Sequence, residues 1–285
     1  MSIAVVTDST AYLPEGFAER YGVRSVGLHV SVDGAAAVGE ADFGPGELAR
    51  AFDRKHRVTT SGATPAELAR AYRAALDGGA EGVVSIHLSR RLSGTWDAAR
   101  LAARDVDPQR VRVVDSRSTA MGLGFSVLAA AATAETGADL SAVESKAALT
   151  AERTTTLFSV QTLEYLRRGG RIGTATAVLG TALAIKPLLH VHEGRIDALE
   201  KVRTTSRAMT RLLEVSLRAA GSGPVAIAVH HLAAPERAEQ LGARLRDRLP
   251  HAECVVSEVG AVIGAHIGPG AVGVVVLPGG WKPSN

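Results

Sequence analysis

The sequence predicts an α/β protein with two closely packed lobes, the first with a mainly parallel sheet and crossover helices and the second with a mixed sheet. Apolar, β-rich runs recur between helical stretches, and each ends in small polar residues. This alternation is typical of strands joined by crossover helices. With 285 residues, 46% of them hydrophobic, the chain exceeds the usual size of one compact domain. We therefore expect an N-terminal lobe over residues 1–153 and a C-terminal lobe over residues 154–285.

In the first lobe, hydroxyl-bearing residues follow the predicted strands. The strands are residues 3–6, 83–88 and 111–114, and the helices are residues 66–76, 95–104 and 122–133. Thr64 and Pro65 mark the start of a helix, because a threonine caps free N–H groups and proline suits the first helical position. Open α/β sheets bind ligands beyond the carboxyl ends of their strands, so the hydroxyls should gather at a ligand crevice.

The second lobe begins near Thr154 and contains a predicted hairpin. Residues 188–192 and 195–202 alternate in polarity around Glu193-Gly194, which is typical of a β-hairpin. A short helix ends at Gly169-Gly170, where paired glycines supply a left-handed stop. The other predicted elements are an apolar helix over 174–185, strands over 156–160, 225–229, 254–258 and 272–277, and helices over 205–219 and 235–248.

Composition excludes several classes of protein. Lys+Arg 32 against Asp+Glu 29 gives a net charge of +3, and the basic residues are dispersed, so nucleic acid is not an expected partner. The single cysteine, Cys254, excludes internal disulfides and multi-cysteine zinc sites. The first ten residues have no charged leader before an apolar stretch, which predicts a cytoplasmic protein. Residues 259–281 lack Lys, Arg, Asp and Glu, but Pro269 and the glycines at 260, 264, 268, 270 and 273 favour a buried turn before a strand over a membrane helix.

Hydroxyl groups at two predicted helix starts are candidate ligands for an anion. Ser93 and Gly94 lie where a strand passes into a helix, and free backbone N–H groups there favour negative charge. The alternative is that Ser93 only caps the helix. Thr60 and Ser61 precede the helix that Thr64 caps, so they have no capping role and at least one could face the same crevice.

His266 lies in a glycine-punctuated apolar segment. It could donate to an anionic headgroup or gate access to it, or it could be a buried histidine that backbone carbonyls satisfy. His190 and His192 share a strand face, yet no acidic or cysteine cluster completes a metal site. Asp8 could act as a base, although a lone carboxylate after a strand more often bonds the next turn.

Chemistry-bearing motifs are otherwise missing. The segment 268–273 matches G-x-G-x-x-G but precedes a strand, so the dinucleotide fingerprint fails on context. The sequence has no ATP-binding P-loop, no nucleophile elbow, no paired carboxylates and no nucleophile with a sequence-marked base. We therefore predict no catalytic residue, no metal and no cofactor. A crevice of hydroxyls with one histidine suits holding an anion better than breaking a bond.

These segments together resemble the DegV family from residue 3 to about residue 278, in the same order. The matching motifs are VVTDSTAYLP, TTSGATP, SIHLSRRLSGT, VVDSRSTAMGLG, LEYLRRGGRI, KPLLHVHEGRI, KVRTTSRAM and GAVIGAHIGPGAVG. The resemblance implies a two-lobed α/β protein that binds a long-chain fatty acid. It further implies a carrier like the FakB subunit of fatty acid kinase, whose partner FakA holds ATP and phosphorylates the bound acid.

The resemblance also assigns roles to individual residues. By position it implies that Ser61 and Ser93 bind the carboxylate, with His266 adjacent. Arg171 and Arg203 match arginines of a partner-docking or phosphate-handling surface. One departure is that Gly62-Ala63 stands where the family usually has Gln-Pro, which would make the loop more flexible and the pocket mouth wider.

The function expected is therefore that of a lipid-binding carrier without catalysis of its own. Its partners would be a long-chain fatty acid and a FakA-like kinase, with transient contact to a membrane surface. Burial gains about 0.8 kcal/mol per methylene, and predicted helices 122–133 and 174–185 could line the acyl tunnel or be ordinary core. The alternatives are a stand-alone phosphotransferase or hydrolase acting on a small phosphorylated metabolite, and a lipid-sensing regulatory module.

Overall fold

The computed structural model describes residues 2–172 and 186–282. The contacts between residues divide the chain into two compact units. The first consists of the described residues of Met1–His29, Ser61–Arg153 and Trp281–Asn285, and the second consists of those of Val30–Thr60 and Thr154–Gly280. The lobe boundary between residues 153 and 154 stays a prediction about folding domains.

The first unit contains a four-stranded parallel sheet in the order β2-β1-β6-β7. Its strands are β1 (Ile3–Asp8), β2 (Arg24–Val26), β6 (Gly82–His87) and β7 (Val111–Asp115). The apolar runs of β1 and β6 are buried along nearly their whole length, as both faces of a parallel sheet are in α/β proteins. A single 3-10 turn, η1 (Ser9–Ala11), follows β1.

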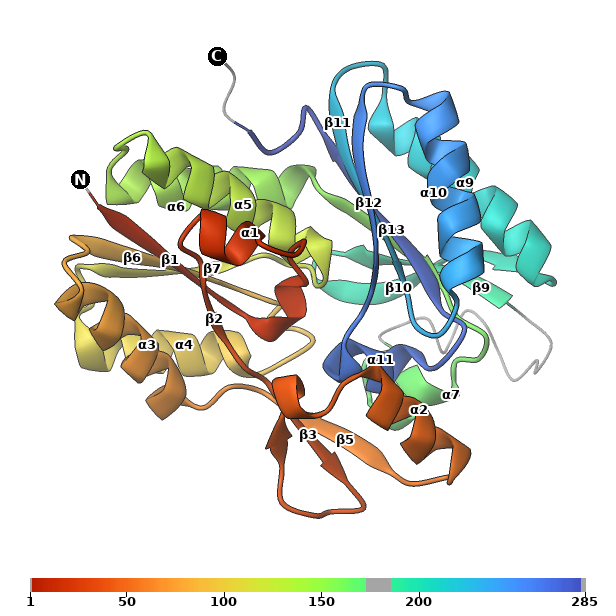
Figure 1. Ribbon diagram of the computed structural model, residues 1–285, viewed down its shortest axis with the longest axis horizontal. Coiled ribbons are helices and arrows are strands. Elements are labelled where there is room, and N and C mark those ends of the chain that lie inside the picture. The colour runs from red at the N-terminus through yellow and green to blue at the C-terminus, as the bar shows by residue number, and fades with distance from the viewer. Residues whose placement is uncertain (1, 173–185, 283–285) are drawn as a thin grey trace. The chain divides into compact units, whose positions relative to one another are not determined.

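Helices cover this sheet. They are α1 (Phe17–Arg20), α3 (Pro65–Asp77), α4 (Thr95–Val106), α5 (Met121–Glu135) and α6 (Leu140–Arg153). Figure 1 shows α3 and α4 along one face of the sheet and α5 and α6 along the other. α3 begins as the sequence predicts: the Thr64 hydroxyl accepts a hydrogen bond from Glu67 N–H, and Glu67 accepts one from Thr64 N–H.

Helix α5 is buried on every side. Each residue from Met121 to Ala132 is buried, and the only charged residue of the helix is Glu135 at its end. A helix that is apolar all round belongs in an interior. The predicted helix 122–133 is thus confirmed as an element. Its proposed partner in the acyl tunnel, the helix over residues 174–185, lies outside the described residues.

The second unit is built on a six-stranded mixed sheet in the order β10-β9-β8-β13-β11-β12. The strands are β8 (Thr155–Ser159), β9 (Lys186–His192), β10 (Arg195–Val202), β11 (Val225–His231), β12 (Ala252–Glu258) and β13 (Val272–Pro278). Only β11 and β12 pair in parallel. The predicted hairpin is confirmed, since β9 and β10 are antiparallel and both Glu193 and Gly194 have positive φ.

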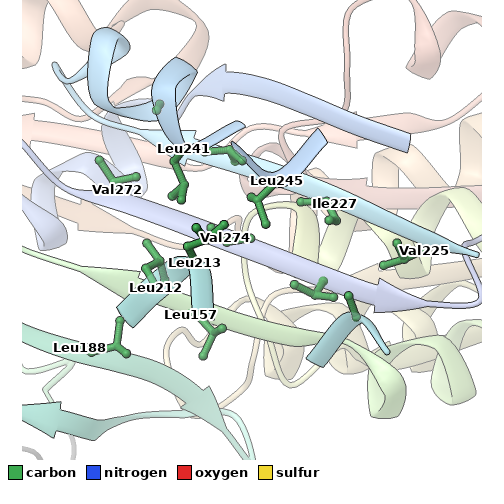
Figure 2. Close-up of a cluster of buried hydrophobic side chains, with 14 of the residues drawn as sticks. Leu157, Leu188, Leu212, Leu213, Val225, Ile227, Leu241, Leu245, Val272 and Val274 are labelled. Carbon is green, nitrogen blue, oxygen red and sulfur yellow. The ribbon is translucent and has the colours of Figure 1, made fainter. Parts of the chain in front are cut away.

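One face of the mixed sheet carries the hydrophobic core of this unit. The helices in the described residues of this unit are α2 (Pro45–Asp53), α7 (Glu164–Arg168), α9 (Thr205–Ala220), α10 (Pro235–Arg248) and α11 (Ala261–Ile267). Leu212 and Leu213 of α9 and Leu241 and Leu245 of α10 pack with Val274 of β13 (Figure 2). These two helices therefore anchor the sheet through a dry layer of aliphatic side chains.

The fold class expected from the sequence is confirmed, and two regions differ from expectation. Residues 261–267 form helix α11 where a turn was expected. Residues 30–60, for which the sequence offered no clear pattern, contribute α2, the turn η2 (Glu40–Asp42) and a small sheet of β3 (His29–Val32), β4 (Val38–Gly39) and β5 (Val58–Ser61). None of the helices in the described ranges has both the length and the apolar character needed to cross a bilayer.

Candidate functional site

The start of helix α4 is packed against the loop that follows β5. The Ser93 hydroxyl lies 2.9 Å from the Thr95 hydroxyl and accepts a hydrogen bond from Thr95 N–H at 3.3 Å. The helix itself begins after Gly94, which offers no side chain as a cap. The N-cap is therefore Gly94 and not Ser93, although the Ser93 hydroxyl does accept from the first N–H group of the helix. This half-buried hydroxyl has further hydrogen-bonding capacity at the position where free N–H groups favour an anion.

Gly62, which follows Thr60 and Ser61, lies against the start of helix α4. A Cβ atom added to Gly62 would lie 2.6 Å from the Thr95 hydroxyl oxygen and 3.2 Å from that of Ser93. Only a residue without a side chain permits this approach. Ser61, the residue before Gly62, is exposed. The structure thus brings Gly62, Ser93, Gly94 and Thr95 together in one hydroxyl-rich group, which we call the α4 hydroxyl cluster. Ser61 adjoins this cluster as the chain neighbour of Gly62.

Thr60 and His266 form a second polar group, within the other unit. The Thr60 hydroxyl lies 2.7 Å from Nε2 of His266, which is on α11. Side chains alternate along a strand, so Thr60 and Ser61 of β5 project to opposite sides of it. Thr60 therefore reaches His266, whereas Ser61 faces the other side of the strand, a distinction that the sequence interpretation did not make.

His266 is a neutral imidazole at pH 7. Burial and, as the smaller cause, the positive charge of Arg171 lower the pKa of His266 to about 4. Its Nδ1 atom is buried and has no hydrogen-bond partner among the described residues. Gly169 explains how the ring fits, because a Cβ atom there would lie 2.1 Å from Nδ1. The two glycines of the Arg-Arg-Gly-Gly segment thus have different roles. Gly169 leaves space for the ring of His266, and Gly170 has a positive φ.

The two arginines singled out in the sequence differ in their surroundings. Arg171 is half-buried, donates a hydrogen bond to the Gly169 carbonyl and lies close enough to His266 to influence its pKa. Arg203 is exposed at the end of β10. Arg171 is therefore part of the surroundings of His266, whereas Arg203 has the exposure that contact with a second protein requires.

Sequence reasoning missed a buried chain of polar side chains beside the α4 hydroxyl cluster. His87 Nδ1 lies 3.0 Å from Asp8 Oδ2, Nε2 of the same ring lies 2.7 Å from the Ser85 hydroxyl, and Tyr72 donates to Ser85 at 2.9 Å. A signal existed, since Ser85 and His87 are two apart on β6 and share a face, and β1 and β6 are both predicted strands. The connectivity is that of a serine triad, but Asp8, Ser85 and His87 are all 0% exposed.

The described residues contain no group of three or more His, Cys, Asp and Glu that could hold a metal ion. His190 and His192 stack on each other with ring centroids 5.4 Å apart on β9. Burial lowers the pKa of His190, and the neighbouring His192 adds to this effect.

The chain is an α/β protein with one parallel sheet and one mixed sheet, and hydroxyl groups gather at the start of helix α4. A family model described as "Uncharacterised protein, DegV family" matches residues 2–279. A DegV domain-containing protein of Streptomyces coelicolor is 53% identical over 275 residues, covering 96% of this chain and 98% of the relative. One from Mycobacterium bovis is 43% identical over 286 residues and both full lengths. The chain belongs to the DegV family.

Solved structures show the same fold. A fatty-acid-binding DegV family protein from Thermus thermophilus has a TM-score of 0.89 and 37% identity, covering 98% of this chain and 100% of that one. A DegV protein from Bacillus subtilis, described as a fatty acid binding protein, has a TM-score of 0.89 and 32% identity, covering 97% and 99%.

Proposed function

We propose that this protein binds one long-chain fatty acid and holds its carboxylate at the α4 hydroxyl cluster. The observation that carries the proposal is the close approach of Gly62 to Ser93 and Thr95, which gathers the hydroxyls of Ser93 and Thr95 at the start of a helix, next to the residue that follows Ser61. The fatty-acid binding of the Thermus and Bacillus relatives supports the same ligand class.

The α4 hydroxyl cluster suits a carboxylate for two reasons. Helix α4 has 12 residues, and its first N–H groups carry partial positive charge toward the cluster. Hydroxyl donors to a charged oxygen form stronger hydrogen bonds than neutral pairs do. Ser61 and Gly94 are exposed and Ser93 is half-buried, so a ligand can reach all three without unfolding the unit.

The acyl chain would supply most of the affinity. Each buried methylene contributes about 0.8 kcal/mol, so the headgroup contacts need only offset the cost of removing the carboxylate from water. The aliphatic side chains of α5 are available as part of the pocket wall. The aromatic content of 4% suits a flexible aliphatic tail better than a planar ligand.

Thr60 and His266 complete the proposed set of ligand residues. A neutral imidazole whose buried Nδ1 lacks a partner in the described part of the chain has one nitrogen free to receive or donate a hydrogen bond. We assign this pair to fatty-acid contact or to control of ligand access. The assignment is independent of the α4 hydroxyl cluster.

The proposal includes a carrier role in the cytoplasm. The protein would present the carboxylate to a FakA-like kinase, which performs the phosphoryl transfer, so this chain would need no catalytic residue or cofactor. Arg203, and Arg171 less directly, would contact the kinase or the new acyl phosphate, because a guanidinium binds phosphate with two parallel hydrogen bonds. Transient contact with a membrane surface would let the carrier load or unload its lipid.

Lipid extraction tests the proposed ligand. Purified protein, denatured and analysed by mass spectrometry, should release a fatty acid in about equimolar amount, and stripped protein should take up palmitate or oleate. A ligand-free protein that also fails to take up either acid contradicts the proposal. Uptake combined with ATP-dependent phosphorylation of a small metabolite, without a second protein, would instead indicate a phosphotransferase.

Serine substitutions test the headgroup site. Ser61→Ala and Ser93→Ala should each weaken fatty-acid binding by about 1–3 kcal/mol, because a buried anionic oxygen loses a charge-assisted donor. Ser141→Ala, at an exposed position in α6, is the matched control and should bind like the wild type. Unchanged affinity in the Ser61→Ala/Ser93→Ala double variant would show that the hydroxyls do not hold the carboxylate.

A further inference from the structure

Asp8 is a fully buried carboxylate whose hydrogen-bonding capacity is filled. Its Oδ1 atom accepts from Thr10 N–H at 3.1 Å and from the Thr10 hydroxyl at 2.5 Å. Its Oδ2 atom accepts from Leu88 N–H at 2.9 Å and from His87 Nδ1 at 3.0 Å. A carboxylate has about four acceptor positions, so each is used here. Burying a carboxylate is costly unless donors surround it, and this arrangement supplies them.

His87 sets the order of donors and acceptors along this row of buried polar side chains. Because its Nδ1 donates to Asp8, its Nε2 can accept from the Ser85 hydroxyl, which in turn accepts from the Tyr72 hydroxyl. All four side chains are 0% exposed. A substrate therefore cannot reach Ser85, so Ser85 cannot act as a nucleophile. The four hydrogen-bonded side chains instead form a rigid support below the carboxyl end of the sheet.

The end of this support is attached to the loop that carries Ser93. Leu88, held by Asp8, is the first residue after β6 and begins that loop. The next residue, Ser89, donates its N–H to the Ser118 carbonyl at 2.8 Å. The Ser89 carbonyl accepts from Leu92 N–H at 2.9 Å and from Ser93 N–H at 3.1 Å. Two hydrogen-bonding steps thus lead from the Asp8 carboxylate to the backbone of Ser93.

We infer that Asp8 is a positioning residue that sets the Ser93 hydroxyl for carboxylate binding by fixing the backbone at Leu88, with His87 holding the Asp8 carboxylate in place. This inference rests on the proposed fatty-acid function. Asp8 touches no ligand in it and acts only through the 88–93 loop.

A double-mutant cycle between Asp8 and Ser93 distinguishes positioning from simple support of the fold. Asp8→Ala should weaken fatty-acid binding about tenfold or more when affinity is measured well below the unfolding temperature of the variant. In a Ser93→Ala background, the same Asp8→Ala change should have little further effect, because the group that it positions is already missing. Amide hydrogen exchange should become faster at residues 88–93.

Tyr72→Phe and Ser85→Ala are the matched controls, since they break the far end of the same buried chain. Both should lower the unfolding midpoint yet bind fatty acid within about twofold of the wild type. If Asp8→Ala does not fold, Asp8→Asn replaces it: whichever way the amide turns, its NH2 group faces the backbone N–H of either Leu88 or Thr10.

Two results would overturn the inference. One is fully additive losses in the Asp8/Ser93 cycle, and the other is a loss of affinity in Tyr72→Phe and Ser85→Ala as large as that in the Asp8 variant. If the wild type takes up no palmitate or oleate, the proposed function fails. Faster exchange at residues 88–93 in the Asp8 variant would then still measure the restraint on the loop.

Discussion

The hydroxyl of Thr60 lies 2.7 Å from Nε2 of His266, although 206 positions separate the two residues along the chain. This hydrogen bond orients an imidazole whose other nitrogen is buried and has no partner among the described residues. An unpartnered buried nitrogen is costly, and such a cost is commonly retained where a ligand later supplies the missing bond.

His266 should titrate far below the usual range for histidine. Its pKa is about 4 because it is buried and lies near Arg171, so the ring should stay neutral through pH 5. Arg171→Gln removes the smaller cause, and the pKa should rise while staying below 6.5, since burial remains. Histidine ring NMR signals followed from pH 3.5 to 8 measure this. Arg203→Gln is the control, and an unchanged pKa in Arg171→Gln would show that the arginine charge does not act on the ring.

Gly62 and Gly94 form a matched pair for testing the α4 hydroxyl cluster. Gly62→Ala would place a Cβ atom 2.6 Å from the Thr95 hydroxyl oxygen, whereas at Gly94 nothing lies within 4 Å of an added Cβ. Gly62→Ala should therefore displace the hydroxyls and weaken fatty-acid binding by roughly tenfold, within the usual 1–3 kcal/mol cost of overpacking. Gly94→Ala keeps the backbone N–H group and adds a Cβ atom in open space, so it should bind almost as the wild type does. Equal affinities in isothermal titration calorimetry would contradict a ligand site at this cluster.

Acid should destabilise the second unit through His230 and His266. Burial lowers the pKa of His230 from 6.5 to about 4. Between these values the unfolded state binds more protons than the folded state, so the free energy of unfolding falls as pH is lowered from 6.5 to 4. The contribution of His230 is roughly 3 kcal/mol at 1.36 kcal/mol per pKa unit.

His230→Asn removes this titration and isolates it in urea unfolding curves. At pH 7.5, where His230 is neutral in both states, the difference from the wild type measures only lost packing. Between pH 6.5 and 4 the variant should lose stability less steeply than the wild type. Parallel curves over that range would mean that His230 is protonated equally in both states.

Arg203 should affect kinase contact and not lipid binding. The side chain is exposed at the end of β10, so Arg203→Ala should leave fatty-acid affinity within about twofold. Acyl-phosphate formation by the partner kinase should fall at low carrier concentration, and added salt should reduce the difference between variant and wild type. Arg244→Ala, an exposed arginine in α10, is the control. Equal rates for Arg203→Ala and the wild type would contradict a docking role.

The sequence by itself determined the elements whose signals are local. Thr64, Pro65 and Glu67 start α3 within four residues, and Glu193-Gly194 closes the β9–β10 hairpin because both adopt positive φ. The α/β class follows from alternating apolar runs. Such signals act between neighbours in the chain, so they are readable without knowing what packs against them.

Tertiary structure alone decided which of the candidate residues meet. Asp8 reaches Leu88 across 80 positions, and Gly62 approaches Thr95 only because β5 ends beside the start of α4. Thr60 reaches His266 while its neighbour Ser61 faces away from it, because a strand turns successive side chains to opposite faces. No local preference encodes these pairings: sheet order and helix packing set them, and burial then makes each polar partner necessary.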